Sequence, residues 1–344
     1  MDKKMWIAAA VSSWLAACSQ QPGPGALDST ASDSTSPPAV GDEAAQAPAT
    51  PTAASPSPAS KALPAQIVAD RAGFVPQSAV YDKTNRRFLA ASLTEGTIFS
   101  ISPDGAATPF IEDTDLVSSV GIAIDEARGR LLVADAGRRG LEGQSKGEAK
   151  LGVYDMKTGK RLAMVDLTAA IRRPPPGARF FADAVAVGSD GTVYVTDMRQ
   201  NAVYAVGGDY KARLLYQFEP RKGLALRGIV YAPEGYLIVA GGSGLFRLTT
   251  GDPATMNEIS LPEPIKGAGG LTFLPDGHLA VVSNSNNRVV ELKGGEHWYR
   301  AEAVGSAGFK GRATSGVVAE GRLYVVHPHA DDKNGPVLEG VALR

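Results

Sequence analysis

The stretch that decides the fold, residues 183–197, reads DAVAVGSDGTVYVTD. A short apolar run is followed by a two-residue Asp-Gly turn and then by a second apolar run that ends in polar residues. Asp-Gly between two such runs is a strong hairpin signal, because glycine accepts the positive φ that a tight β-turn requires. The stretch therefore predicts a β-hairpin.

The same hairpin pattern recurs along the rest of the chain. The other copies are residues 78–92, 121–135, 228–241, 270–284 and 316–327. A third short strand follows every copy, and a fourth follows the first five. Four strands at a period of roughly 42–46 residues are typical of a β-propeller blade. The sequence therefore predicts an all-β protein, a six-bladed β-propeller with four strands per blade.

The last copy is followed by too little sequence for a fourth strand. Residues 65–69, just before the first copy, have the composition of a short strand. We expect this N-terminal strand to complete the sixth blade and close the ring. Closure of this kind leaves no exposed sheet edge.

Residues 1–18 have the features of a bacterial lipoprotein signal. Lys3 and Lys4 precede an apolar run that is too short to span a bilayer and ends in LAAC at 15–18. This ending resembles a lipobox, which implies cleavage before Cys18 and lipidation of its thiol. Cys18 is the only cysteine in the sequence, so it has no disulfide partner. An ordinary secretory signal cut after Ala17 is the alternative.

Residues 19–60 contain no Lys, no Arg and no aromatic residue. Such a segment buries too little apolar surface to offset its ordering entropy, so it is predicted to be a disordered tether between the anchor and a single propeller domain, residues 61–344. Ser19, in place of Asp, makes the signal similar to those of outer-membrane lipoproteins. We therefore expect an exported protein on the outer membrane that faces the periplasm.

The charge pattern argues against a nucleic-acid partner. The sequence has 35 Lys and Arg against 36 Asp and Glu, and the basic residues are dispersed. A nucleic-acid-binding surface would need a clustered basic face. We expect a monomer whose only membrane contact is the lipid on Cys18.

Strand order within a blade places the long segments 136–150, 170–181 and 328–337 on one face of the propeller, the top face. Long loops in a compact fold are usually functional or disordered, so we expect a binding mouth there. The alternative for 136–150 is a solvated loop without a function.

Two rings of residues are expected around the top of the central channel, one at the starts of first strands and one at the ends of second strands. The candidate ligand-binding residues from these rings are Gln77, Asp135, Asp183, Asp197, Arg227, Asn284 and His327. Asp183 and Arg227 could orient a small polar or anionic ligand, or a protein partner. They could equally form a structural ion pair.

The segments FADAVAV at 181–187, LRGIVYAPEG at 226–235 and GAGGL at 267–271 resemble the regucalcin, gluconolactonase and paraoxonase-like superfamily of six-bladed propellers. The resemblance covers about residues 74–329. It implies a divalent cation, often Ca²⁺, at the top of the channel, where the metal polarises a lactone or ester bond.

The chain departs from the metal site that this resemblance implies. Gln77 stands where the family has Glu, Ala182 and Arg227 where it has Asn, and Gly269 where it has Asp. Asp183, the one retained carboxylate, cannot supply the six to eight oxygens that Ca²⁺ takes. We therefore expect no metal and no cofactor, and a binding or scaffold role. A lactonase-like hydrolase acting on a sugar lactone is the alternative.

The four histidines give weaker signals. His278 and His297 are expected in solvated turns. His327 and His329, beside Asp331 and Asp332, could bind a transition metal, but an exposed loop is the preferred interpretation. No Gly-x-Ser-x-Gly motif of an α/β-hydrolase occurs.

The lipobox yields a direct test. Replacing Cys18 by Ser removes the thiol that would carry the lipid, so the Cys18→Ser protein should move from the membrane fraction to the soluble fraction. Fractionation followed by immunoblotting measures this. Membrane association that survives the substitution would rule out the lipid anchor.

Overall fold

The structure is a computed structural model that describes residues 62–137, 147–174, 176–328 and 337–344. The predicted signal and tether, with Cys18, lie outside the described residues, as do His329, Asp331 and Asp332. Residues Ser60–Arg344 form one compact unit. Within the described ranges, no helix has the length and hydrophobicity needed to cross a membrane.

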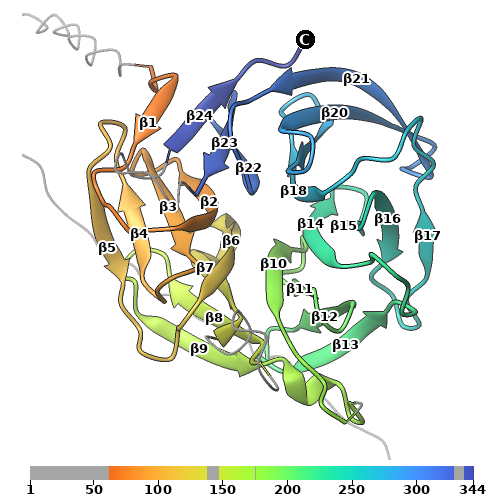
Figure 1. Cartoon of the computed structure of the whole chain (residues 1–344). Coiled ribbons are helices and arrows are strands. Elements are labelled where there is room, and N and C mark those ends of the chain that lie inside the picture. The colour runs from red at the N-terminus through yellow and green to blue at the C-terminus, as the bar shows by residue number, and fades with distance from the viewer. Residues whose placement is uncertain (1–61, 138–146, 175, 329–336) are drawn as a thin grey trace, which may run out of the picture. The chain divides into compact units, whose positions relative to one another are not determined.

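The described residues form six antiparallel sheets of four strands each, which confirms the all-β, six-bladed β-propeller (Figure 1). The first three blades are β2 (Pro76–Asp82), β3 (Arg87–Ser92), β4 (Ile98–Ile101) and β5 (Ala107–Ile111); β6 (Ser119–Asp125), β7 (Arg130–Asp135), β8 (Lys150–Asp155) and β9 (Arg161–Asp166); and β10 (Ala182–Val187), β11 (Val193–Asp197), β12 (Ala202–Val206) and β13 (Ala212–Gln217).

The other three blades are β14 (Leu226–Ala232), β15 (Tyr236–Gly241), β16 (Gly244–Thr249) and β17 (Met256–Glu258); β18 (Ala268–Phe273), β19 (Leu279–Ser283), β20 (Arg288–Gly295) and β21 (Arg300–Gly308); and β22 (Ser315–Ala319), β23 (Arg322–His327) and β24 (Val337–Val341) with β1 (Gln66–Val68). Two short 3₁₀ helices, η1 (Glu126–Arg128) and η2 (Thr168–Ala170), follow β6 and β9.

The sixth blade is completed by β1, which pairs antiparallel with β24 and opposes Ile67 to Leu338. This pairing confirms the predicted closing strand, one residue shorter at each end than expected. The phenol of Tyr324 donates to the carbonyl oxygen of Pro64 at 2.7 Å, which also holds the incoming chain against the blade.

The first strands of the blades form the inner ring. Each contacts the first strand of the next blade, and β22 contacts β2, so the ring is closed (Figure 1). The core lies between neighbouring blades: Leu132 of the second blade packs in one buried cluster with Val195 and Tyr204 of the third. Burial of this apolar surface holds each blade against the next.

Five of the six inner strands carry a β-bulge near their start. In the third blade the pairing changes from Ala182 with Asp197 to Val185 with Val195, so Asp183 and Ala184 oppose Thr196 alone. The first, second, fourth and fifth blades shift register at the corresponding place. A bulge bends the strand and re-aims its side chains. It thereby sets the direction of the residues at the top of the channel.

Neighbouring inner strands approach each other at these bulges with no room for a side chain. A Cβ on Gly121 would lie 2.3 Å from the carbonyl oxygen of Asp183, and a Cβ on Gly228 would lie 2.0 Å from that of Gly269. Real atoms do not approach so closely, so glycine is required at both positions.

Side-chain hydroxyl groups bond inner strands to the neighbouring blade at the same level. Ser78 Oγ donates to the carbonyl oxygen of Val120 at 2.7 Å, and Thr196 Oγ1 donates to that of Arg227 at 2.7 Å. These bonds satisfy carbonyl groups that the bulges remove from the regular ladder.

The Asp-Gly turns of the third and fifth blades, at 190–191 and 276–277, are longer than the two residues that the sequence suggested. Val187 pairs with Val193, so five residues form the turn around Asp190 and Gly191. The Asp190 carboxylate accepts from the backbone N–H of Thr192 at 2.9 Å, and Gly191 has a φ of 86°. The side-chain bond and the left-handed glycine stabilise this wider turn.

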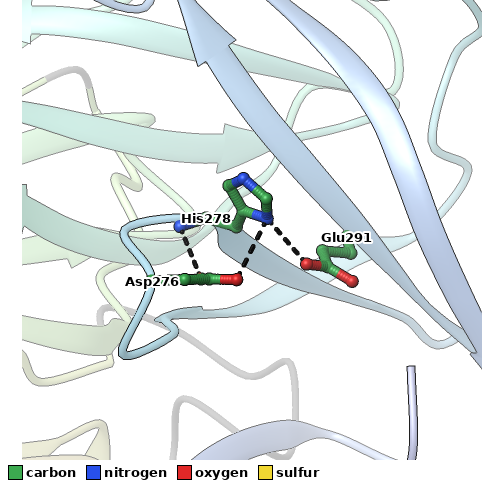
Figure 2. A group of neighbouring side chains, drawn as sticks. All are labelled: Asp276, His278 and Glu291. Atoms are coloured by element: carbon green, nitrogen blue, oxygen red, sulfur yellow. Dashed lines mark hydrogen bonds and ion pairs between the residues drawn. The ribbon is translucent and has the colours of Figure 1, made fainter. Parts of the chain in front are cut away.

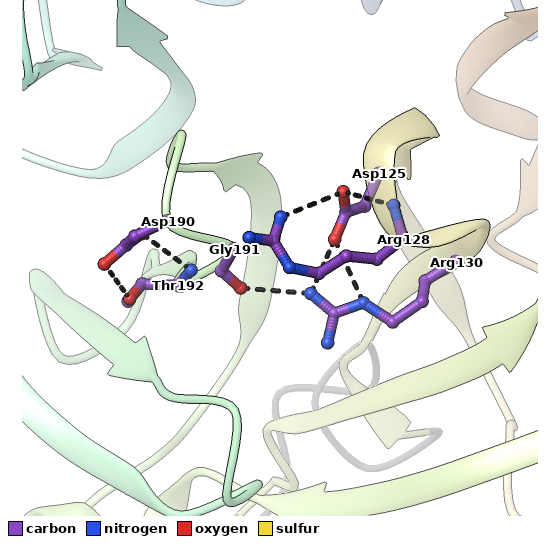
Figure 3. A network of polar contacts seen from close by, with 6 residues as sticks. All are labelled: Asp125, Arg128, Arg130, Asp190, Gly191 and Thr192. Atoms are coloured by element: carbon purple, nitrogen blue, oxygen red, sulfur yellow. Dashed lines mark hydrogen bonds and ion pairs between the residues drawn. The ribbon is translucent and has the colours of Figure 1, made fainter. Parts of the chain in front are cut away.

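This turn docks onto the second blade through Arg130 (Figure 3). The buried Arg130 guanidinium donates to the carbonyl oxygen of Gly191 at 3.0 Å and pairs with the buried Asp125 at 2.6 Å. A buried arginine with fixed partners at the bottom of the blades adds specificity to their arrangement.

Candidate functional site

A cavity of about 270 Å³, called here the mouth cavity, lies where the inner strands begin. All six residues at the starts of the first strands line it: Gln77, Val120, Asp183, Arg227, Gly269 and Ser315. Asn284, Ser285 and Arg312 also line it. The six strand starts therefore converge on one cavity at the end of the channel.

The formal charges of the mouth cavity come from Asp183, Arg227 and Arg312, so its lining carries an excess of one positive charge. Asp183 is half-buried, whereas Arg227 and Arg312 are exposed. Among the described residues no ion pair within 4.0 Å joins Asp183 to Arg227. The two side chains share the cavity without forming a direct pair, which leaves the guanidinium groups accessible to a ligand.

The environment of Asp183 changes its acidity. Loss of hydration in the cavity wall raises the pKa of the carboxyl from 3.8 to about 6. The positive charge of Arg227 opposes this rise in pKa, and the negative charge of Asp197 adds to it. Asp183 can therefore take up a proton on mild acidification, which would remove the negative charge from the cavity lining.

Two other candidate residues, Asp135 and Asp197, lie outside the lining and are fully buried at the ends of β7 and β11. Asp135 accepts from the backbone N–H groups of Val117, Ser118 and Gly137 at 2.7–2.9 Å. Asp197 accepts from the N–H groups of Phe181, Arg199 and Gln200 and from the hydroxyl of Tyr204. Both carboxylates therefore fasten the connections between blades.

His327 is also buried and outside the lining. Its Nδ1 lies 3.0 Å from the carbonyl oxygen of Arg312, and its Nε2 lies 2.9 Å from Glu339 Oε2. His327 thus ties the segment that carries Arg312 to β24 of the closing blade.

Arg312 is the charged residue of the cavity lining that could not be recognised in the sequence. It lies in the connection before β22, where no motif marks it, and its only signal is that it stands three residues before the strand start at Ser315. Gln77, Asp183, Arg227 and Asn284 are the predicted residues that the structure brings together.

A larger groove of about 720 Å³ lies along the fourth blade. Two of its three charged residues, Arg221 and Glu258, already face each other at 3.5 Å, and Arg221 stacks over Phe246. The mouth cavity is the better candidate site, because residues from all six strand starts converge there.

The fold and its mouth cavity define a six-bladed β-propeller with a polar site at one end of the channel. No protein-family model and no curated protein matches the chain. Solved structures with a similar fold include Mala s 1, the major allergen of Malassezia sympodialis, at 16% identity, 82% coverage of this chain, 97% coverage of that chain and a TM-score of 0.70.

Gluconolactonase-like propellers are also among these neighbours. XC5397 from Xanthomonas campestris, described as a gluconolactonase, is 15% identical over 80% of this chain and 89% of its own, with a TM-score of 0.55. A luciferin-regenerating enzyme is 13% identical over 81% of this chain and 96% of its own, with a TM-score of 0.57. At these identities the likeness establishes the fold.

The raised pKa of Asp183 predicts a pH-dependent effect on stability. An acid with a raised pKa binds its proton more tightly in the folded protein than in the unfolded chain. Ionisation of Asp183 therefore lowers the free energy of unfolding as the pH rises from about 4 through 6. Asp183→Asn cannot ionise, so above pH 6 its melting temperature should exceed that of the parent protein. Near pH 4 the two melting temperatures should be equal. Calorimetry across this pH range measures the difference.

Asp190→Asn is the matched control. Hydrogen bonds to Thr192 lower the pKa of Asp190, so its ionised form favours folding and its replacement should give no gain at neutral pH. An Asp183→Asn protein without a gain above pH 6 would contradict the assigned environment.

Proposed function

We propose that this protein is a lipid-anchored, periplasm-facing member of the gluconolactonase-like superfamily that binds a small anionic ligand in its mouth cavity. The observation that carries the proposal is the cavity of about 270 Å³ with Arg227 and Arg312 in its lining and without an ion pair between Arg227 and Asp183 among the described residues. The lipobox at 15–18 and the tether support the anchoring and the location.

Arginine side chains suit a carboxylate or a phosphate, because the planar guanidinium presents a fork of donors. The amides of Gln77 and Asn284 line the same cavity and can hydrogen-bond hydroxyl groups. Asp183 accepts from a ligand hydroxyl when ionised. A small hydroxylated carboxylate, such as a sugar acid, fits this set of groups best.

The residues do not suit the calcium ion that the superfamily resemblance implies. Ala182 is a buried methyl group, Gly269 has no side chain, and the Arg227 guanidinium stands in the same cavity. Asp183 is the one carboxylate of the lining, and a neighbouring cation disfavours a divalent metal. We infer that the site works without calcium and that the protein acts as a monomeric binding protein.

A second candidate function is metal-free hydrolysis of a sugar lactone. The observation that favours it is the pKa of about 6 at Asp183, which suits a general base acting on water near neutral pH. Arg227 could stabilise the negative charge that develops on the lactone oxygen. Turnover of gluconolactone that persists in EDTA and is lost in Asp183→Asn would favour this enzyme over the binding protein.

The binding proposal is tested with gluconate and phosphate as probes, using isothermal titration calorimetry on the purified Cys18→Ser protein. Loss of a charge-assisted hydrogen bond costs about 1.5–3 kcal/mol, so Arg227→Ala should weaken binding of a bound probe by about 10–100-fold. Because Arg227 is exposed, the melting temperature should change little.

Arg213→Ala on the outer strand β13 is the control and should leave binding unchanged, because Arg213 is exposed and outside the mouth cavity. Two results would refute the proposal: no binding of either anion by the parent protein, or equal affinities of the Arg227→Ala and parent proteins. A calcium-dependent rise in melting temperature would overturn the calcium inference.

A further inference from the structure

Three side chains of types that can ligate metals meet at the end of the fifth blade opposite to the mouth cavity. Figure 2 shows the three side chains together. Asp276 lies in the β18–β19 turn, His278 ends that turn, and Glu291 lies on β20. One potential ligand atom from each residue lies within 4.8 Å of the other two. Among the residues that the structure describes, this is the one group of three or more His, Cys, Asp or Glu side chains with that property.

Both carboxylates face the same nitrogen of the imidazole (Figure 2). His278 Nδ1 lies 2.7 Å from Glu291 Oε1 and 3.3 Å from Asp276 Oδ2. A single hydrogen on Nδ1 cannot make a full hydrogen bond to both. The cluster therefore holds two carboxylates around one imidazole, and within the described residues neither carboxylate has a Lys or Arg partner.

Local structure holds each group in place. The backbone N–H of His278 donates to Asp276 Oδ1 at 3.0 Å, which orients the Asp276 side chain. Glu291 is opposite Gly305, where a Cβ would lie 2.5 Å from Glu291 Oε2. The Glu291 carboxylate thus occupies the space that a side chain at position 305 would need, and glycine at 305 leaves it free.

The propeller repeat offers an internal comparison. The turn of the third blade has the same backbone bonds, from Gly188 to Thr192, as the turn from Leu274 to His278. In the third blade Thr192 stands in the place of His278, and its hydroxyl donates to Asp190 at 2.8 Å. By strand register Ala205 stands in the place of Glu291. The turn requires neither an imidazole nor a second carboxylate, so the fold alone does not explain the cluster.

We propose that Asp276, His278 and Glu291 form a binding site for a divalent transition-metal ion of the zinc type. Zinc takes imidazole nitrogen at about 2.0–2.1 Å and carboxylate oxygen at about 2.0–2.2 Å, which places tetrahedral ligand atoms about 3.3–3.6 Å apart. The distance of 3.3 Å between His278 Nδ1 and Asp276 Oδ2 meets this requirement. The distance of 2.7 Å between His278 Nδ1 and Glu291 Oε1 has to increase by less than about 1 Å.

The site is exposed enough for a metal ion to enter it. Glu291 and His278 are half-buried with side chains 14% and 26% exposed, whereas Asp276 is 56% exposed. The ion can enter past Asp276, and water can complete its coordination. One imidazole and two carboxylates disfavour Ca²⁺, which takes six to eight oxygen ligands. Bound zinc would join the β18–β19 turn to β20 and stabilise the fifth blade.

The test uses the full Cys18→Ser chain without a purification tag, dialysed against EDTA and then titrated with Zn²⁺ in a calorimeter. We expect one site whose affinity falls by about tenfold or more in His278→Gln and in Glu291→Gln, because each loses a ligand. The matched controls are His297→Gln and Glu302→Gln, whose exposed side chains lie outside the cluster and which should bind as the parent does.

Cobalt supplies a second measurement. Co²⁺ bound at this site should show visible absorption bands that disappear in His278→Gln, while circular dichroism of the metal-free variants confirms that they fold. The proposal is overturned if the parent chain binds no Zn²⁺, or if His278→Gln binds it as tightly as the parent. Neither result bears on the anion site, which lies at the other end of the inner strands.

Discussion

The structure depends on the close approach of neighbouring inner strands around the channel. At Gly121 and Gly228 the backbone of one blade occupies the space of a side chain in the next. The bulges make this contact compatible with four-stranded sheets, because each takes residues out of the ladder and turns them toward the channel. Asp183 and Arg227 are such residues. The same constraint that closes the ring therefore brings these two charges to one cavity.

Polar side chains near the top of the channel fall into two groups that differ in their partners. Asp135 and Asp197 each accept three backbone N–H bonds, which compensate for burial and tie the loops between blades. Asp183, in contrast, faces the mouth cavity, and desolvation governs its pKa. Aspartates near the top of the channel thus either bond to backbone N–H groups or line the mouth cavity, depending on whether they stand at a strand end or in a bulge.

Much of the fold could be predicted from the sequence because the hairpin repeat is strong. Asp-Gly and Glu-Gly turns recur between apolar runs at a near-constant period, and residues 65–69 stand where a closing strand is needed. The repeat also predicts which residues begin the first strands. Gln77, Asp183 and Arg227 could therefore be predicted to lie together at the mouth of the channel, where they line the cavity.

Features that depend on loop paths and on packing between strands could not be predicted in this way. Arg312 stands in a connection without a motif, and the buried partners of His327 depend on how that connection crosses the blade. The sequence predicts a solvated turn for His278, but its imidazole contacts Glu291, because Glu291 of β20 pairs with Ala280, two residues beyond His278. Turn length and cross-strand register are set by three-dimensional contacts, not by local composition.

The most direct test of this account is the free energy of unfolding of Gly228→Ala compared with that of Gly208→Ala, measured by chemical denaturation. A methyl group at 228 meets the carbonyl oxygen of Gly269 at 2.0 Å, whereas at 208 it meets no atom within 4 Å. Forcing an extra group into a packed site costs about 1–3 kcal/mol, so Gly228→Ala should be destabilised by that amount and Gly208→Ala should not. Equal stabilities of the two variants would contradict the claim that side-chain-free contact between inner strands organises the propeller and its mouth cavity.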